Sequence, residues 1–187
     1  MPISLSQKEK GIYQKEADLI RALQEADAGA QLYFYQKYFG KMFGIAFRYS
    51  SNRESAYEII NTAFLKVFNA ISNYEEMGNF YGWVATIVKR TAQDYCKRYD
   101  FGKKDYETIL PPLQATYNLA ISQLAIEDIF RLVQQLPPAS RTVFNLFVID
   151  GYRHGEIAQL LNISPGTSKW HLANARKILI DLMNNQK

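Results

Sequence analysis

Apolar residues recur at spacings of three and four along most of this chain, and this feature limits its possible folds more than any other. Between Tyr35 and Tyr49, for example, such a series lines one face of an expected helix. The chain has 10 Gly and 6 Pro, which lie mainly between the periodic segments. No alternating run is long enough to make a sheet. The sequence therefore predicts an all-α fold.

The helical segments fall into two blocks. The sequence Ser51-Asn52-Arg53-Glu54 has the spacing of a capping box and should start a helix. Pro138 can open another helix, because proline is well tolerated at the first helical position. The expected helices are 15–27, 30–49, about 53–71 and 80–98 in the first block, and 126–133, 138 to about 151, 155–161 and 165–183 in the second.

Residues 99–122 interrupt this periodicity with Gly102, Pro111 and Pro112 and several charged residues. At roughly two dozen residues the stretch is longer than most loops inside a compact domain. We therefore expect two small helical domains, 15–98 and 123–187, joined by a flexible linker at 99–122 and mobile relative to each other.

The composition excludes several classes of protein. The chain has 187 residues, 48% of them hydrophobic, which is enough for a packed core, and its net charge of +4 fits a polyanionic partner. Cys96 is the only cysteine, so no internal disulfide can form, and two histidines need carboxylate help to hold a metal. We therefore expect no metal and no cofactor. We also expect no membrane insertion and a cytoplasmic location, since no apolar run approaches ~20 residues and no signal peptide is visible.

The sharpest pattern lies between Glu156 and Leu172. A short helix, a turn around Asn162, and a second helix capped by Ser164 and opened by Pro165 predict a helix-turn-helix. The free N–H groups at the start of the second helix suit phosphate, and its outward side chains suit base edges in the major groove. An ordinary helical hairpin with a polar surface is the alternative. The side chains predicted to face DNA are Thr167, Lys169, Trp170, His171, Asn174 and Lys177.

Trp170 and His171 are the unusual members of this set. A tryptophan on a helix usually belongs to the core, but Trp170 lies two residues from both Ser168 and Leu172, which form the expected core stripe, so we expect its side chain to be exposed. His171 has no partner in a recognisable catalytic motif. We interpret it as a DNA contact or a plain surface residue.

The helix expected at 80–98 interleaves aromatic and basic residues. Phe80, Tyr81 and Trp83 precede a basic face, and aromatic surfaces beside cations suit unpaired nucleic acid. The alternative is a core aromatic stripe with a solvated basic face, which we favour for Trp83. The outward residues expected on this helix are Lys89, Arg90, Gln93, Lys97 and Arg98.

Five stretches together resemble the extracytoplasmic-function group of sigma factors, within the bacterial sigma-70 family. No single stretch is unique to that family, but the ordered set is highly specific. Two departures are that Arg90 stands where many members have asparagine, and that Trp170-His171 replaces a commoner Ser-Arg pair. The stretches are Leu32–Phe47, Ala56–Phe68, Asn79–Tyr95, Leu136–Tyr152 and Glu156–Leu179.

The resemblance implies a protein with sigma region 2 at 15–98 and sigma region 4 at 123–187. Such proteins are not enzymes. They bind the clamp helices and flap of core RNA polymerase and direct it to promoter DNA, and an anti-sigma factor is a further expected partner. Region 2 would handle the −10 element and its melting through Asn79, Phe80 and the outward residues of 80–98, and 165–177 would read the −35 element. The implied clamp contacts are Glu58, Asn61, Phe64, Leu65 and Phe68.

A one-component transcription regulator is the main alternative, since it would share the helix-turn-helix but bind duplex DNA without polymerase. A generic helical scaffold would lack the ordered pair of blocks. A nucleic-acid enzyme is disfavoured, because no helix carries paired carboxylates and no glycine-rich phosphate loop is present. Dependence on core polymerase distinguishes a sigma factor from a one-component regulator, because only the sigma factor needs the polymerase for strong promoter binding.

Overall fold

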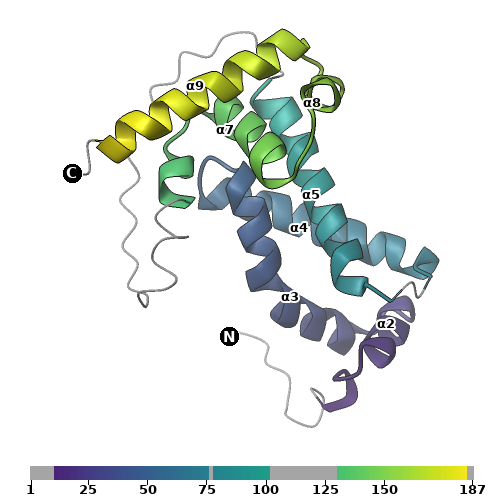
Figure 1. Ribbon diagram of the computed structural model, residues 1–187. Coiled ribbons are helices and arrows are strands. Elements are labelled where there is room, and N and C mark those ends of the chain that lie inside the picture. The colour runs from purple at the N-terminus through teal and green to yellow at the C-terminus, as the bar shows by residue number, and fades with distance from the viewer. Residues whose placement is uncertain (1–10, 76–77, 102–129, 185–187) are drawn as a thin grey trace. The chain divides into compact units, whose positions relative to one another are not determined.

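The computed structural model describes residues 11–75, 78–101 and 130–184, and these residues form helices and no strands (Figure 1). The all-α prediction is confirmed, and most predicted helices begin or end within a few residues of the observed ones. The elements are α2 (Glu16–Gln24), α3 (Ala28–Tyr49), α4 (Arg53–Ala70), η1 (Ile71–Asn73), α5 (Phe80–Tyr99), α7 (Pro138–Phe144), η2 (Asn145–Ile149), α8 (His154–Leu161) and α9 (Pro165–Asn184).

The chain divides into two compact units. The first unit comprises residues 1–47 and 52–92, and the second comprises 48–51 and 93–187, so that α3 and α5 each contribute to both. The expected linker, 99–122, lies outside the described residues beyond Phe101, as do residues 126–129, the first half of the helix expected at 126–133. The domain boundaries and the mobility of the domains stay predictions.

The first unit is built around aromatic rings. The ring of Phe34 in α3 is fully buried, and its centroid lies 4.8 Å from that of Tyr38, 5.0 Å from that of Phe64 and 6.1 Å from that of Phe80. These contacts join α3, α4 and α5. Offset and edge-on aromatic pairs add stability beyond the area that they bury.

The start of α4 differs in one detail from the predicted capping box. A helix does start within the predicted run, at Arg53, but the capping side chain is that of Asn52 and not Ser51. Asn52 Oδ1 accepts a hydrogen bond of 2.8 Å from the backbone N–H of Ser55. Asparagine caps a helix about as well as serine does.

Polar side chains are buried in the second unit where the sequence pattern indicates only an apolar helix. Arg141 has no exposed surface, and its guanidinium donates 3.1 Å to the carbonyl oxygen of Gln134 and 3.0 Å to Oγ of Ser51. Next to it, Thr142 Oγ1 donates 2.9 Å to a carboxylate oxygen of Asp100. Buried polar groups need such partners to offset their desolvation.

The helices α7 and α9 pack together over a small apolar core. α7 begins at Pro138, as predicted, and the following five-residue segment η2 is a π-helix that ends before Gly151, whose φ of +78° favours glycine. The core contains Val133, Leu136 and Ala175, with Phe144, Ile178 and Leu179 packed against it. This packing fixes one face of α9 and leaves the opposite face free for a partner.

Candidate nucleic-acid interface

Helices α8 and α9 form the predicted helix-turn-helix. Asn162, between them, has the left-handed conformation expected from the sequence, with φ 58° and ψ 47°. The hydroxyl of Ser164 accepts a hydrogen bond of 2.9 Å from the backbone N–H of Thr167 and so caps α9, whose first residue is Pro165. The side chain of Thr167 is partly buried in the same cap, with Oγ1 2.8 Å from the Ser164 hydroxyl.

A histidine fixes α8 against α9. His154 Nδ1 lies 2.9 Å from Oγ of Ser168, and the imidazole stacks on Phe147 with ring centroids 4.6 Å apart. Desolvation, followed by the positive charges of Lys169 and Arg176, lowers the pKa of His154 and so favours the neutral ring. The fully buried Ser168 is therefore a specific partner of His154.

The outer face of α9 carries exposed cations around one large apolar side chain. Trp170 is 62% exposed, which confirms the prediction made from its position. Lys169 and Lys177 are exposed as predicted. Arg176 is also exposed and was missing from the predicted set, although its place seven residues after Lys169 puts it on the same face.

The sequence pattern predicts that His171 and Asn174 lie on this outer face, but the structure places neither side chain fully on it. Both side chains are partly buried and turn towards Ser140 of α7, whose hydroxyl lies 3.2 Å from His171 Nδ1 and accepts a 3.2 Å hydrogen bond from Asn174 Nδ2. Burial lowers the pKa of His171. The prediction of fully outward side chains is wrong because Ser140 offers both residues a buried polar partner.

The α5 residues predicted to face DNA divide into exposed and buried ones. Arg90, Lys97 and Arg98 are exposed, as is Asn79, whose Oδ1 accepts a 2.8 Å hydrogen bond from the N–H of Gly82 at the start of the helix. Lys89 is partly buried.

Two of the predicted α5 contacts are corrected by the structure. Phe80 has no exposed surface and packs edge-on against Phe34, so its ring is part of the core of the first unit. Gln93, which was expected to point outward, is 5% exposed. The burial of Ala92, Gln93 and Cys96 shows that α5 is covered on a wider face here than the apolar pattern indicates.

The residues predicted to meet polymerase lie on α4. Glu58, Asn61 and Leu65 are exposed, and Leu65 is 64% exposed although it is apolar. Phe68 is partly buried. Phe64 is 2% exposed and packs against Phe34, so the structure places it inside the unit rather than on the predicted contact surface.

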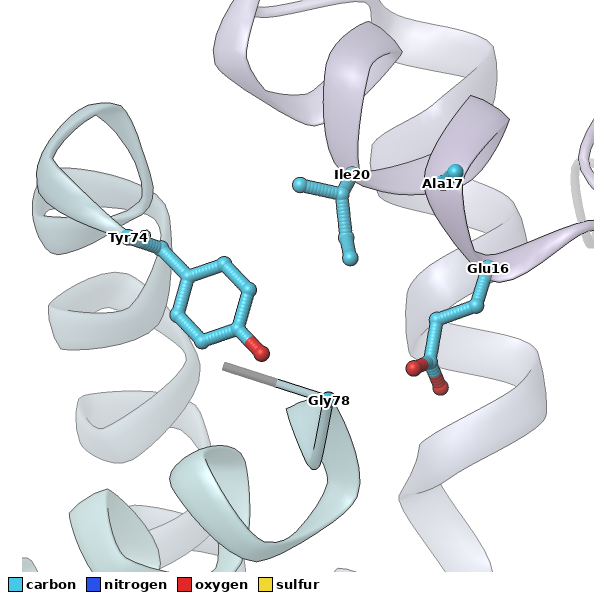
Figure 2. A pocket seen from close by; sticks show the side chains of 5 residues that line it. All are labelled: Glu16, Ala17, Ile20, Tyr74 and Gly78. Atoms are coloured by element: carbon cyan, nitrogen blue, oxygen red, sulfur yellow. The ribbon is translucent and has the colours of Figure 1, made fainter. Parts of the chain in front are cut away.

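A cavity of about 230 Å³ lies in the first unit beside the start of α2. Figure 2 shows the ring of Tyr74 on one side of it, Ile20 and Ala17 on the other, and the carboxylate of Glu16 near Gly78. The described residues that line it include a carboxylate and no lysine or arginine. These residues do not supply the positive charge that a phosphate would need.

Among the residues that the structure describes, no group of three or more His, Cys, Asp or Glu side chains is placed to hold a metal ion. No helix in those ranges is both long enough and apolar enough to cross a membrane.

Comparison with known proteins gives matches along most of the chain. The family model described as Sigma-70 region 2 matches residues 34–101, and the model described as Sigma-70, region 4 matches residues 126–179. The ECF RNA polymerase sigma-E factor of Haemophilus influenzae is 22% identical over 173 residues, which are 86% of this chain and 91% of that protein.

Other relatives have similar identity and coverage. The RNA polymerase sigma-H factor of Pseudomonas aeruginosa is 21% identical over 89% of this chain and 92% of its own length. The ECF RNA polymerase sigma-E factor of Escherichia coli is 23% identical over 86% of this chain and 90% of its own. A solved structure of CnrH in complex with the cytosolic domain of CnrY is 16% identical, with a TM-score of 0.45, and the match covers 90% of this chain and 97% of that one.

Proposed function

We propose that this chain reads two promoter elements with two different helices. The proposal starts from its family: the chain belongs to the extracytoplasmic-function group of the sigma-70 family and is thus an RNA polymerase sigma factor for transcription initiation. Helix α9 reads the −35 element as duplex. Helix α5 binds the −10 element and assists its melting. The chain itself catalyses no reaction and works in the cytoplasm, where the polymerase is.

The observation that carries the −35 assignment is the charge and exposure of α9. From Pro165 to Lys177 the helix contains no acidic residue, and Lys169, Arg176 and Lys177 are exposed around Trp170. Its capped N-terminus presents backbone N–H groups, and such an end attracts phosphate. A helix that enters the major groove with its first turns needs this combination.

The −10 assignment depends on the exposed residues of α5 and its start. Arg90, Lys97 and Arg98 supply positive charge, and the ring of Tyr81 is 41% exposed. Cations with an accessible aromatic ring suit a single strand better than a duplex. Asn79 and Lys89 remain in the proposed set, whereas Phe80 and Gln93 are buried and are left out of it.

Contacts with the polymerase clamp helices are proposed for the exposed side of α4. Leu65 supplies an apolar side chain with Glu58 and Asn61 on the same surface, a mixture typical of protein interfaces. We propose the second unit as the part that meets the polymerase flap. An anti-sigma factor would act by covering these same surfaces.

The division between the two DNA-reading helices can be tested with two alanine variants in the reconstituted holoenzyme. Lys169→Ala and Arg90→Ala are compared on a duplex promoter and on the same promoter with an unpaired −10 region. Both should be impaired on the duplex. The pre-melted template should restore Arg90→Ala more than Lys169→Ala, because unpairing supplies only the step assigned to α5. Equal restoration of both, or restoration of neither, contradicts the assignment.

A further inference from the structure

The side chain of Trp170 is the most prominent apolar group on the exposed face of α9. Trp170 is the sixth residue of the helix and lies within the turns that approach base edges in a helix-turn-helix. Of its four neighbours at helical spacings of three and four, Gly166 and Ala173 are too small to cover it. The other two, Thr167 and Asn174, have side-chain contacts with Ser164 and Ser140, and Trp170 is 62% exposed. The indole is therefore open to whatever α9 binds.

The orientation of the indole is supported from the side. The ring of His171 lies edge-on to it, with centroids 4.9 Å apart and an interplanar angle of 77°. His171 is itself held by Ser140 at 3.2 Å and by the ring of Phe101, whose centroid lies 5.7 Å away. Trp170 therefore packs on one side against a neighbour that is itself held in place, and such packing lowers the conformational freedom that the indole loses on binding.

The chemistry of the DNA bases limits what this side chain can recognise. Among the groups that base pairs present in the major groove, the only apolar one is the C5-methyl group of thymine. An indole face has no acceptor and offers apolar surface, with a single N–H donor at its edge. Lys169, Arg176 and Lys177 are exposed on the same helix and can hold phosphates, which leaves Trp170 as the group suited to a methyl contact.

We propose that Trp170 determines promoter specificity by packing its indole against the C5-methyl group of a thymine in the −35 element. This inference rests on the proposed function of α9. The −35 element must then contain a thymine, on either strand, at the position that Trp170 reaches. Because burying one methyl-sized group favours binding by about 0.8 kcal/mol, removing that methyl should weaken binding about fourfold.

Replacement of thymine by deoxyuridine tests this, since it removes only the methyl group and keeps base pairing. After the −35 element has been defined with the holoenzyme, each of its thymines is replaced singly, and binding is measured for the wild-type chain and for Trp170→Ala. We expect one or two positions at which deoxyuridine costs the wild type about fourfold, and at which Trp170→Ala is equally weak with either base. Ile180→Ala is the matched control, because Ile180 is on the same helix and 57% exposed.

A second readout locates the contact directly. With 5-iododeoxyuridine at the sensitive position, the iodine takes the place of the methyl group, and irradiation should crosslink the DNA to the peptide that contains Trp170. Crosslinking to another residue overturns the proposal. The proposal is also overturned if binding depends on the −35 element but no replacement of thymine by deoxyuridine weakens it. It is likewise overturned if deoxyuridine weakens binding of Trp170→Ala as much as binding of the wild type. A Trp170→Ala variant whose defect is in binding core polymerase overturns it as well, and would assign the indole to a protein partner.

Failure of the proposed function gives a different result. If the holoenzyme shows no dependence on any −35 sequence, α9 does not read that element, and the thymine contact is overturned with it.

Discussion

The hydroxyl of Ser140 in α7 lies 3.2 Å from Nδ1 of His171 in α9, and this contact ties the recognition helix to the helix behind it. The same hydroxyl accepts a hydrogen bond from Asn174, one turn further along α9. Ser140 is 1% exposed. His171 and Asn174, which the sequence pattern predicts to contact DNA, therefore each use one side-chain nitrogen to hold α9 against α7.

Replacing Ser140 should loosen this attachment. In Ser140→Ala the partly buried side chains of His171 and Asn174 lose a buried partner, and we expect the free energy of unfolding to fall by about 1 kcal/mol. Urea denaturation followed by circular dichroism measures the change, with Ser72→Ala, at an exposed position, as the control. An unfolding curve for Ser140→Ala that superimposes on that of the control would show that the contact contributes nothing.

Arg141 should be more sensitive than any exposed arginine. Arg141→Ala removes a fully buried guanidinium together with its hydrogen bonds to Ser51 and Gln134. It also removes a positive charge that favours the ionised carboxylate of Asp100. We expect a loss of about 3 kcal/mol, within the range for breaking a buried charged network. Arg98→Ala, an exposed arginine, should change stability by less than about 0.5 kcal/mol. Similar losses for both variants would contradict the buried role of Arg141.

Stability should depend on pH through His171. Burial lowers the pKa of this ring, so near pH 6 the unfolded chain binds more protons than the folded one. The contribution of neutral His171 is present above pH 6.5 and is lost as the pH falls through the lowered pKa. His171→Gln, which cannot titrate, should show a smaller drop in stability between pH 7 and pH 5 than the wild type.

The pKa of His154 is also lowered, so His154→Gln should likewise lose less stability than the wild type between pH 7 and pH 5. Asp100 acts in the opposite direction, since burial raises its pKa and protonation on acidification favours the folded state. The comparison is therefore made between each variant and the wild type at matched pH values. A pH profile that is identical in His171→Gln and the wild type would contradict the burial of this ring.

The exposed leucine of α4 gives a test of polymerase binding. Leu65→Arg introduces a charge at a position that is 64% exposed, so the fold should be unaffected, whereas the affinity for core polymerase should fall about tenfold through loss of an apolar interface contact. Asn69→Arg, one turn along α4 and also exposed, controls for the added charge. Equal affinities of the two variants would place the polymerase contact elsewhere.

The helix-turn-helix was predictable because each of its signals is local. Asn162 adopts the left-handed conformation that asparagine tolerates, Ser164 caps α9, and Pro165 opens it, and none of these depends on a distant residue. The exposure of Trp170 followed in the same way from its spacing to Ser168 and Leu172, which are both buried.

Most of the corrected residues pack against or hydrogen-bond to residues far away in the sequence. Helical spacing places His171 and Asn174 near the outer face, but it cannot show that Ser140, more than 30 positions earlier, offers them a buried hydroxyl. Likewise, the sequence pattern predicts an outward side chain for the polar Gln93 and a stacking ring for Phe80, whereas both side chains are buried. A polar residue in the core and an aromatic residue at a helix start are ambiguous until the surrounding elements are known.

Transcription with purified components tests the central claim most directly. Core polymerase with and without the chain is supplied with a library of genomic fragments from its host, and run-off transcripts are sequenced. A sigma factor predicts a set of discrete start sites that appear only when the chain is added and that share sequences near −35 and −10. No start site that depends on the chain, or specific promoter binding by the chain alone that core polymerase does not strengthen, would contradict the account and favour a regulator that acts without the polymerase.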